Sequence, residues 1–229
     1  MKPTTAQKLL KINREFYEKF ALSFASTRNN LWEKEILDFC AKIKPKSSIL
    51  DLGCGNARLY QILSNQSIKY LGIDSSKNLI AMNQERYGNN LFKIGDGLKL
   101  TIKNKFNYVI SIAVLQHIPS KKLQLQFLKN IYTSLKPKGK ILITIWNRWQ
   151  DKYKKYFNTD KPFDDMDFAD IMIPWRGNKN ARFIHAFKPD ELHQLAEESG
   201  FKNIKCFTSK YGRKTNINKG FNIYLIGKK

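Results

Sequence analysis

The stretch SILDLGCGNAR, residues 48–58, decides the fold that we expect for this chain of 229 residues. Its first five residues form a short apolar run that predicts a buried strand. Gly53, Cys54 and Gly55 predict a tight turn before a helix that starts near Asn56. Glycines let a backbone approach a ligand closely, and the start of a helix offers unpaired N–H groups. We therefore interpret the stretch as a cofactor-binding loop, with a strand–turn–helix corner that binds nothing as the alternative.

Two acidic residues mark the ends of the first two predicted strands. Asp51 lies two residues before the first glycine, unlike the acid of the dinucleotide pattern G-x-G-x-x-G, which lies in the following strand. A carboxylate at that place suits a ligand with a cationic amine. The next strand, KYLGID at residues 69–74, ends in Asp74, at the spacing where a carboxylate holds two ribose hydroxyls. A helix-capping role for Asp74 is compatible with that function.

Polar residues also follow the next two predicted strands. A strand at residues 91–94 precedes Asp96 and Gly97, where a polar group would meet an adenine amino group, although G-D-G is also an ordinary turn. The apolar run at residues 106–115 predicts a central parallel strand. His117 follows it, at the edge where open α/β sheets bind ligands. A single histidine in this place is as often structural as functional.

The remaining pattern alternates helices and strands. Helices are predicted over residues 4–25, 31–43, 58–64, 120–135 and 189–199, and further strands over residues 140–146, 204–208 and 221–226. This alternation predicts an α/β fold with a mostly parallel sheet and helices on both faces. The length suits a single domain, residues 1–229, preceded by a helical extension in residues 1–46.

Residues 147–180 lose this periodicity. The segment is too long for a simple connection in a compact domain, so we expect a functional insertion or lid. Its acidic run, FDDMDFAD, is more typical of a solvated loop in a basic protein than of a metal site.

Composition narrows the range of partners. The net charge of +22 favours a polyanion such as RNA, although lysine (33) far exceeds arginine (8), a bias that a genome rich in A and T also produces. Cys40, Cys54 and Cys206 are far apart, which indicates neither a disulfide framework nor a zinc site. Neither a membrane-spanning run nor an export signal is visible, so we expect a cytoplasmic protein.

Four stretches, LDLGCGNAR, GID, FNYVISIAVLQHI and LKPKGKILITIW, together resemble the class I methyltransferases that use S-adenosylmethionine (SAM). The resemblance spans residues 48–146. It implies a Rossmann-like, seven-stranded, mostly parallel sheet with an insertion after the fifth strand, and SAM as cofactor. The residues that it implies for SAM binding are Tyr17, Asp51, Gly53, Cys54, Gly55, Asp74, Ser75, Asp96, Gly97, Ser111 and Val114.

Three further stretches, YEKFALSFASTRNNLW, DIMIPW and RFIHAFKPDEL, are similar to those of the tRNA wobble-uridine carboxymethyl methyltransferases. That resemblance implies methylation of the carboxylate of 5-carboxymethyluridine in tRNA. A carboxylate is already ionised at neutral pH and needs no general base, so the enzyme must chiefly position it. The planar fork of arginine suits this task. We therefore expect Arg28, His117 and Arg182 to converge on the acceptor.

Three positions depart from the usual pattern. Ala57 stands where a third glycine is common, Asn107 where an aspartate is common, and Gln116 where the family usually has the first of two histidines. Of the three, Gln116 bears on the identity of the substrate.

The resemblance also implies a possible partner, since family members in eukaryotes and archaea are activated by a small zinc-binding subunit. An exposed third strand, with Leu91, Phe92 and Ile94, would offer it a docking edge. Two other functions stay open: a small-molecule methyltransferase, and a catalytically silent RNA-binding protein on the same fold.

Overall fold

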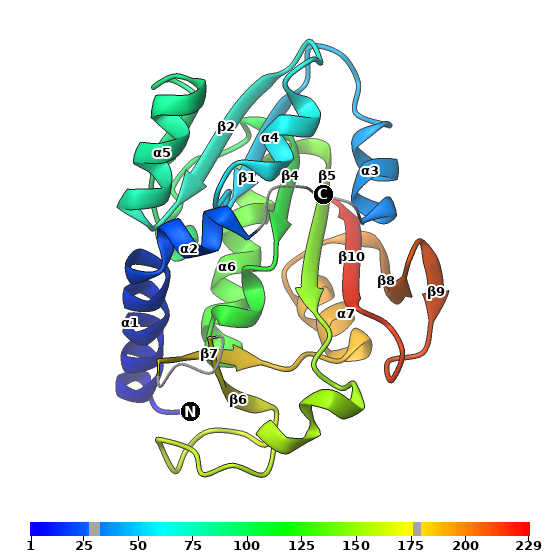
Figure 1. Cartoon of the computed structure of the whole chain (residues 1–229). Coiled ribbons are helices and arrows are strands. Elements are labelled where there is room, and N and C mark those ends of the chain that lie inside the picture. The colour runs from blue at the N-terminus through cyan, green and yellow to red at the C-terminus, as the bar shows by residue number, and fades with distance from the viewer. Residues whose placement is uncertain (28–32, 176–179) are drawn as a thin grey trace.

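The computed structural model describes residues 1–27, 33–175 and 180–229, and their fold is built around one mixed sheet (Figure 1). Across this sheet the strands follow the order β3 (Phe92–Ile94), β2 (Lys69–Asp74), β1 (Ser48–Leu52), β4 (Phe106–Ile112), β5 (Leu135–Trp146), β10 (Asn222–Lys228), β8 (Lys202–Lys210) and β9 (Arg213–Thr215). The strands from β3 to β5 are parallel, and β10 is antiparallel to both β5 and β8. The mostly parallel sheet that the sequence predicts is confirmed.

The sheet holds the seven predicted strands and one more at its edge. Tyr211 and Gly212 form a two-residue hairpin loop between β8 and β9, and both have positive φ, 52° and 79°. A loop of this type favours Asn-Gly or Asp-Gly, so Tyr-Gly carries little of the usual signal. The predicted strand over residues 106–115 ends earlier than expected, at Ile112, because Ala113 has a φ of 58° and turns the chain.

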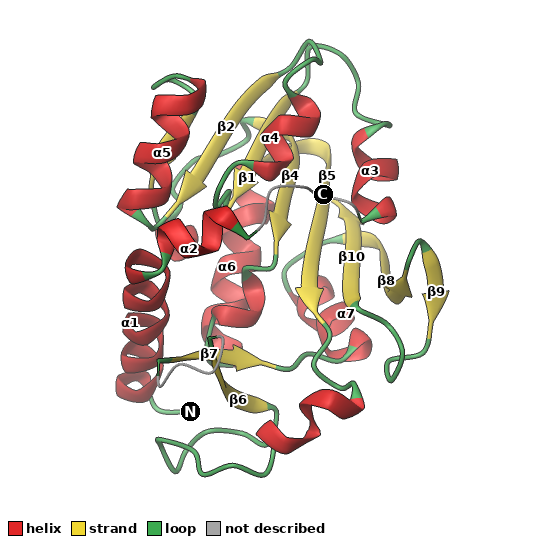
Figure 2. Cartoon of the chain, in the orientation of Figure 1, coloured by secondary structure: helices red, strands yellow, loops and turns green. Residues whose placement is uncertain are grey.

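Helices cover both faces of the sheet (Figure 2). One face carries α6 (Lys121–Ser134) and α7 (Pro189–Glu198), and the other carries α3 (Lys34–Cys40), α4 (Arg58–Leu63) and α5 (Lys77–Tyr87). Side chains alternate along a strand, so Leu50 of β1 packs with the first group and Ile49 with the second. Both faces of the central strands are therefore buried core.

The helix predicted over residues 4–25 is in fact two helices. The first, α1 (Pro3–Lys19), ends at Phe20, whose φ of −102° and ψ of 17° leave the helical range, and α2 (Ala21–Ser26) follows. A buried asparagine fastens α1 to the body: Asn13 donates to the carbonyl oxygens of His117 and Phe183, at 3.0 and 3.1 Å, and accepts from the Phe183 N–H at 2.8 Å. Helix α1 thereby forms a fixed wall beside β7 (Ala181–His185).

The segment predicted to be an insertion has structure of its own. It contains a 3₁₀ helix, η3 (Asp151–Tyr156), and a strand, β6 (Asp170–Pro174), which pairs with β7 in a separate two-stranded sheet. Trp149, Phe157 and Phe168 stack on one another, and Phe157 packs in a buried cluster with Ile171 and Ile184 of the two strands. The insertion thus has a small core of its own.

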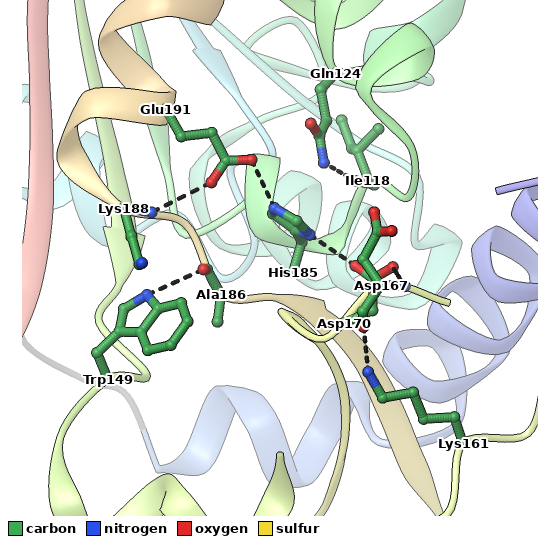
Figure 3. Close-up of polar contacts among 10 residues, drawn as sticks. All are labelled: Ile118, Gln124, Trp149, Lys161, Asp167, Asp170, His185, Ala186, Lys188 and Glu191. Atoms are coloured by element: carbon green, nitrogen blue, oxygen red, sulfur yellow. Dashed lines mark hydrogen bonds and ion pairs between the residues drawn. The ribbon is translucent and has the colours of Figure 1, made fainter. Parts of the chain in front are cut away.

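Buried polar contacts fasten this insertion to α7 (Figure 3). His185 of β7 lies between two carboxylates, with Nδ1 2.7 Å from Asp170 Oδ1 and Nε2 2.8 Å from Glu191 Oε1. The indole N–H of Trp149 donates to the carbonyl oxygen of Ala186 at 3.1 Å.

Among the described residues, no helix is long and apolar enough to cross a membrane.

Candidate cofactor and acceptor site

A cavity lies where the parallel strands β1 to β5 end, between the sheet and α1. Nine residues predicted for the site line it: Tyr17, Gly53, Gly55, Asp74, Ser75, Asp96, Gly97, Val114 and His117. They come from α1 and from the segments that follow four strands. Their convergence follows from topology, because parallel strands present their carboxyl ends at one edge of a sheet.

The glycine loop takes a backbone shape that side chains would disturb. Gly53 and Gly55 have φ values of 80° and 52°, and a Cβ on Gly53 would run into the Cγ2 of Val114. The N–H of Gly53 donates to the carbonyl oxygen of Ile73 at 2.7 Å, which ties the loop to β2. The glycines therefore allow the close approach of loop and strand that shapes the cavity.

Asp74 organises the loop and still faces the cavity. Its Oδ2 accepts from the Gly55 N–H and its Oδ1 from the Ser76 N–H, both at 2.9 Å. Burial raises the pKa of this carboxyl, although these N–H groups oppose the shift. Because each carboxylate oxygen has two lone pairs, Asp74 keeps acceptor capacity for ribose hydroxyls.

Helix α1 supplies lining residues that the sequence analysis missed. Arg14 forms an ion pair with Asp96, with Nη2 2.6 Å from Oδ2, and Glu18 accepts from the Ser76 hydroxyl at 2.7 Å. Asn13 and Arg14 lie four and three residues before Tyr17, so both are its neighbours on the helix surface. Their spacing from Tyr17, which the sequence already predicted for the site, is a signal that could have identified them.

Three residues predicted to bind the cofactor do not line the cavity. Asp51 points to the same side of β1 as Ile49, toward the face covered by α3 and α4, and accepts from the Tyr70 hydroxyl at 2.7 Å. Burial raises its pKa to about 7. Ser111 is fully buried and donates to the Leu52 carbonyl at 2.8 Å, and Cys54 lies in the core. Strand alternation explains why Asp51 faces away from the cavity although it lies beside the loop.

His117 is held in one orientation. Its Nδ1 lies 3.0 Å from the carbonyl oxygen of Phe183, and its Nε2 lies 2.8 Å from the Tyr17 hydroxyl. A carbonyl oxygen only accepts, so Nδ1 carries the proton and the Tyr17 hydroxyl donates to Nε2 when the ring is neutral. The pair of Tyr17 and His117 thus forms a fixed part of the cavity wall.

Arg182 lies within an aromatic box formed by Phe16, Tyr17, Trp146 and Trp175. Its Cζ lies 4.7 Å from the centre of the Trp146 ring and 5.0 Å from that of Trp175. The side chain is 4% exposed, and its Nε and Nη1 have no hydrogen-bond partner among the described residues. Arg182 therefore offers free N–H donors beside His117, with which it shares Tyr17 and Trp146 as neighbours. Arg28 lies outside the described residues.

The structure places all three residues that depart from the usual pattern. Ala57 adopts a left-handed conformation, φ 60°, at the start of α4, where glycine is favoured. Asn107 Oδ1 accepts from the Ser48 N–H at 2.9 Å and joins β1 to β4. Gln116 is buried behind the cavity, where its Oε1 accepts from the Trp146 N–H at 3.3 Å. Gln116 therefore supports Trp146 and does not itself line the cavity.

Comparisons with known proteins show which proteins this chain is similar to. A family model described as "Methyltransferase domain" matches residues 24–205. The tRNA (carboxymethyluridine(34)-5-O)-methyltransferase of Schizosaccharomyces pombe is 26% identical over 212 residues, which cover 81% of this chain and 86% of that protein. The protein of the same description from Xenopus tropicalis is 34% identical over 140 residues, 61% of this chain but 21% of that longer protein.

Among solved structures, a SAM-dependent methyltransferase from Methanosarcina mazei superposes with a TM-score of 0.68 at 19% identity. The match covers 84% of this chain and 96% of that one. At this identity the likeness concerns the fold.

Proposed function

The chain belongs to the methyltransferase domain family, and we propose that it transfers the methyl group of SAM to the carboxylate of 5-carboxymethyluridine at the wobble position of tRNA. The product is a methyl ester. The observation that carries the choice of acceptor is Arg182, a buried guanidinium with free N–H donors beside the cavity. Planar N–H forks of this kind hold carboxylates in a single orientation.

The cavity fits SAM as the methyl donor. Asp74 suits the two ribose hydroxyls, Asp96 suits the adenine amino group, and Gly53 leaves the backbone open to close approach. Apolar side chains supply the walls for the adenine ring: Leu52, Ile73, Leu79, Leu98 and Phe127. When bound, SAM supplies an electrophilic methyl group on a sulfonium centre.

The chain's own residues orient the acceptor. A carboxylate acceptor is ionised at neutral pH, so no base has to remove a proton. This requirement agrees with His117, whose two ring nitrogens are engaged by Tyr17 and Phe183. Arg182 holds the carboxylate, and Tyr17 and His117 form the wall against which it lies. Orientation of this kind is worth up to roughly 7–11 kcal/mol in well-aligned systems.

The substrate is tRNA, as in the relatives, and the net charge of +22 supports its binding through phosphate contacts. A cytoplasmic location and a small zinc-binding activator are further parts of the proposal. The candidate docking edge is β3, where Ile94 is 57% exposed. Phe92 does not contribute, because it is fully buried in a cluster with Tyr60 and Tyr70.

The stability of the product to alkali tests this function. tRNA is incubated with the enzyme and SAM labelled in its methyl group, and is then treated with mild alkali. A methyl ester releases its label as methanol, whereas N-methyl and ribose O-methyl groups keep theirs. Label that stays on the RNA would exclude carboxylate methylation, and labelling of free nucleosides but not of tRNA would favour a small-molecule methyltransferase.

A further inference from the structure

A second cavity adjoins the cofactor cavity. Its volume is about 690 Å³, within the range of small-molecule sites. Arg58 and Trp146 line both cavities, so the two meet at these side chains. The second cavity continues outward between η3 and the β8–β10 end of the sheet.

Arg148 is a buried cation at this junction. It is 9% exposed, and its Cζ lies 4.3 Å from the centre of the Tyr153 ring and 4.7 Å from that of Trp146. Its Nε has no hydrogen-bond partner among the described residues. Burial lowers the pKa of Arg148, and the nearby charge of Arg182 lowers it further, although Tyr153 opposes both effects.

Two buried guanidinium groups therefore contact one indole ring. Arg148 and Arg182 both have their Cζ 4.7 Å from the centre of Trp146, and neither forms an ion pair with a carboxylate of the described residues. Two like charges in a poorly solvated place repel each other, and free N–H donors there are costly. An anion bound between them relieves both costs.

The rest of the second cavity suits a pyrimidine ring. Tyr153, Tyr211 and Phe221 offer aromatic faces and edges for stacking. Glu33 lines the same cavity, and its buried Oε2 has no hydrogen-bond partner among the described residues. A carboxylate oxygen there can accept from the N3–H of uracil. The lining thus places acceptor, donor and stacking groups around a space next to the methyl-transfer site.

We propose that the second cavity binds the acceptor nucleotide, a pyrimidine nucleotide bearing a carboxylate, and that Arg148 together with Arg182 holds this carboxylate beside Trp146. This inference rests on the proposed function and deepens it, because it locates the acceptor and adds Arg148 as a residue that determines specificity. A backbone phosphate on Arg148 is the competing occupant.

Binding of two RNAs without SAM separates these occupants. The RNAs are anticodon stem–loops that differ only at the wobble position, which carries 5-carboxymethyluridine or uridine, and binding is followed by fluorescence anisotropy. Charge-assisted hydrogen bonds predict that the parent protein binds the carboxymethyl RNA at least about tenfold more tightly. Arg148→Gln should remove most of this preference and leave the affinity for the uridine RNA nearly unchanged. Lys152→Gln, the matched control in the same cavity, should weaken both RNAs equally.

Thermal unfolding separates the loss of a binding residue from a failure of the variant to fold. Arg148→Met removes a buried, incompletely paired charge, so the ligand-free variant should melt at a higher temperature than the parent and still lose the preference for the carboxymethyl RNA. A variant that melts at a lower temperature, with the preference intact, would identify Arg148 as a structural residue.

The inference is overturned if Arg148→Gln weakens both RNAs equally, which indicates a phosphate contact, or if the parent protein shows no preference. The proposed function is judged separately, by the release of label from tRNA. A parent protein that prefers the carboxymethyl RNA but forms no alkali-labile product would refute the proposed function and support the second cavity as a binding site for the acceptor nucleotide. A methylating parent whose preference survives Arg148→Gln would refute the site and keep the function.

Discussion

Asp74 couples the glycine loop to the cofactor cavity, since its carboxylate accepts from the Gly55 N–H and also lines the cavity. We expect this carboxylate to hold both ribose hydroxyls of SAM, and Asp74→Ala removes these acceptors. Hydrogen bonds to charged groups are worth roughly 1.5–3 kcal/mol each, so the affinity for SAM should fall at least about tenfold. Isothermal titration calorimetry measures this loss.

Asp164→Ala is a suitable control for that experiment, because it removes a carboxylate that is exposed in the insertion. It should leave SAM affinity unchanged. Parental SAM affinity in Asp74→Ala would show that the loop does not bind the ribose. Thermal unfolding of both variants separates loss of the ligand contact from loss of the loop itself.

Substitution of Arg182 by lysine separates the effect of its positive charge from the effect of its planar guanidinium group. Arg182→Lys keeps the positive charge but loses the paired N–H geometry, so we expect kcat on carboxymethylated tRNA to fall by about tenfold or more. SAM affinity should change by less than about twofold, because Arg182 does not line the cofactor cavity. Steady-state kinetics together with SAM calorimetry measure the two effects. Near-parental turnover would refute the role of the fork.

At the scale of elements, the insertion is fastened by a buried charged cluster. His185 lies between Asp170 of β6 and Glu191 of α7. Burial opposes the charged form of His185, but the two carboxylates outweigh burial and raise the pKa from 6.5 to about 9. The cluster thus joins a strand of the insertion to a helix of the main fold by an ion pair whose strength depends on pH.

This shift predicts a pH dependence of stability. His185 binds its proton more tightly in the folded state than in the unfolded state. The stabilisation of the fold by protonated His185 is therefore complete below pH 6.5 and is lost as the pH rises toward 9. The loss is on the order of 3 kcal/mol if the whole shift is expressed. The free energy of unfolding, measured by urea titration at several pH values, should fall in this window for the parent protein and much less for His185→Gln.

His193→Gln provides the matched control, because His193 lies on α7, is far more exposed than His185 and pairs with the exposed Glu197. Its pH profile should follow that of the parent protein. An unchanged profile in His185→Gln would mean that the cluster does not gain a proton on folding.

At the scale of the whole molecule, the net charge bears on the proposed binding of tRNA. A net charge of +22 favours contacts with phosphates, and each such contact releases counterions on binding. If only about two phosphates are contacted, the affinity should still fall about tenfold between roughly 50 and 200 mM salt. Filter binding of tRNA at increasing salt tests this, and SAM affinity is the control, since it should change little. A tRNA affinity that is insensitive to salt would contradict binding through phosphates.

The local pattern of the chain was enough to determine the core of the fold and much of the cofactor cavity. The apolar run before Gly53, the spacing to Asp74 and the position of His117 after β4 are features of neighbouring residues, and parallel strands bring their carboxyl ends together by topology. The resemblance of the segment around Arg182 to a known family predicted that this residue belongs to the site, and the structure places it beside His117.

Only the tertiary structure decided the remaining features of the site, because these features depend on contacts between distant segments of the chain. Asp51 faces Tyr70 and not the cavity, since the direction of its side chain is set by strand alternation and by what packs on each face. Arg14 reaches Asp96 across 82 positions, and Arg148 and Arg182 meet at Trp146 from opposite ends of the insertion. A sequence specifies which side chains are present, but burial and the pairing of charges arise only when the folded chain brings them together.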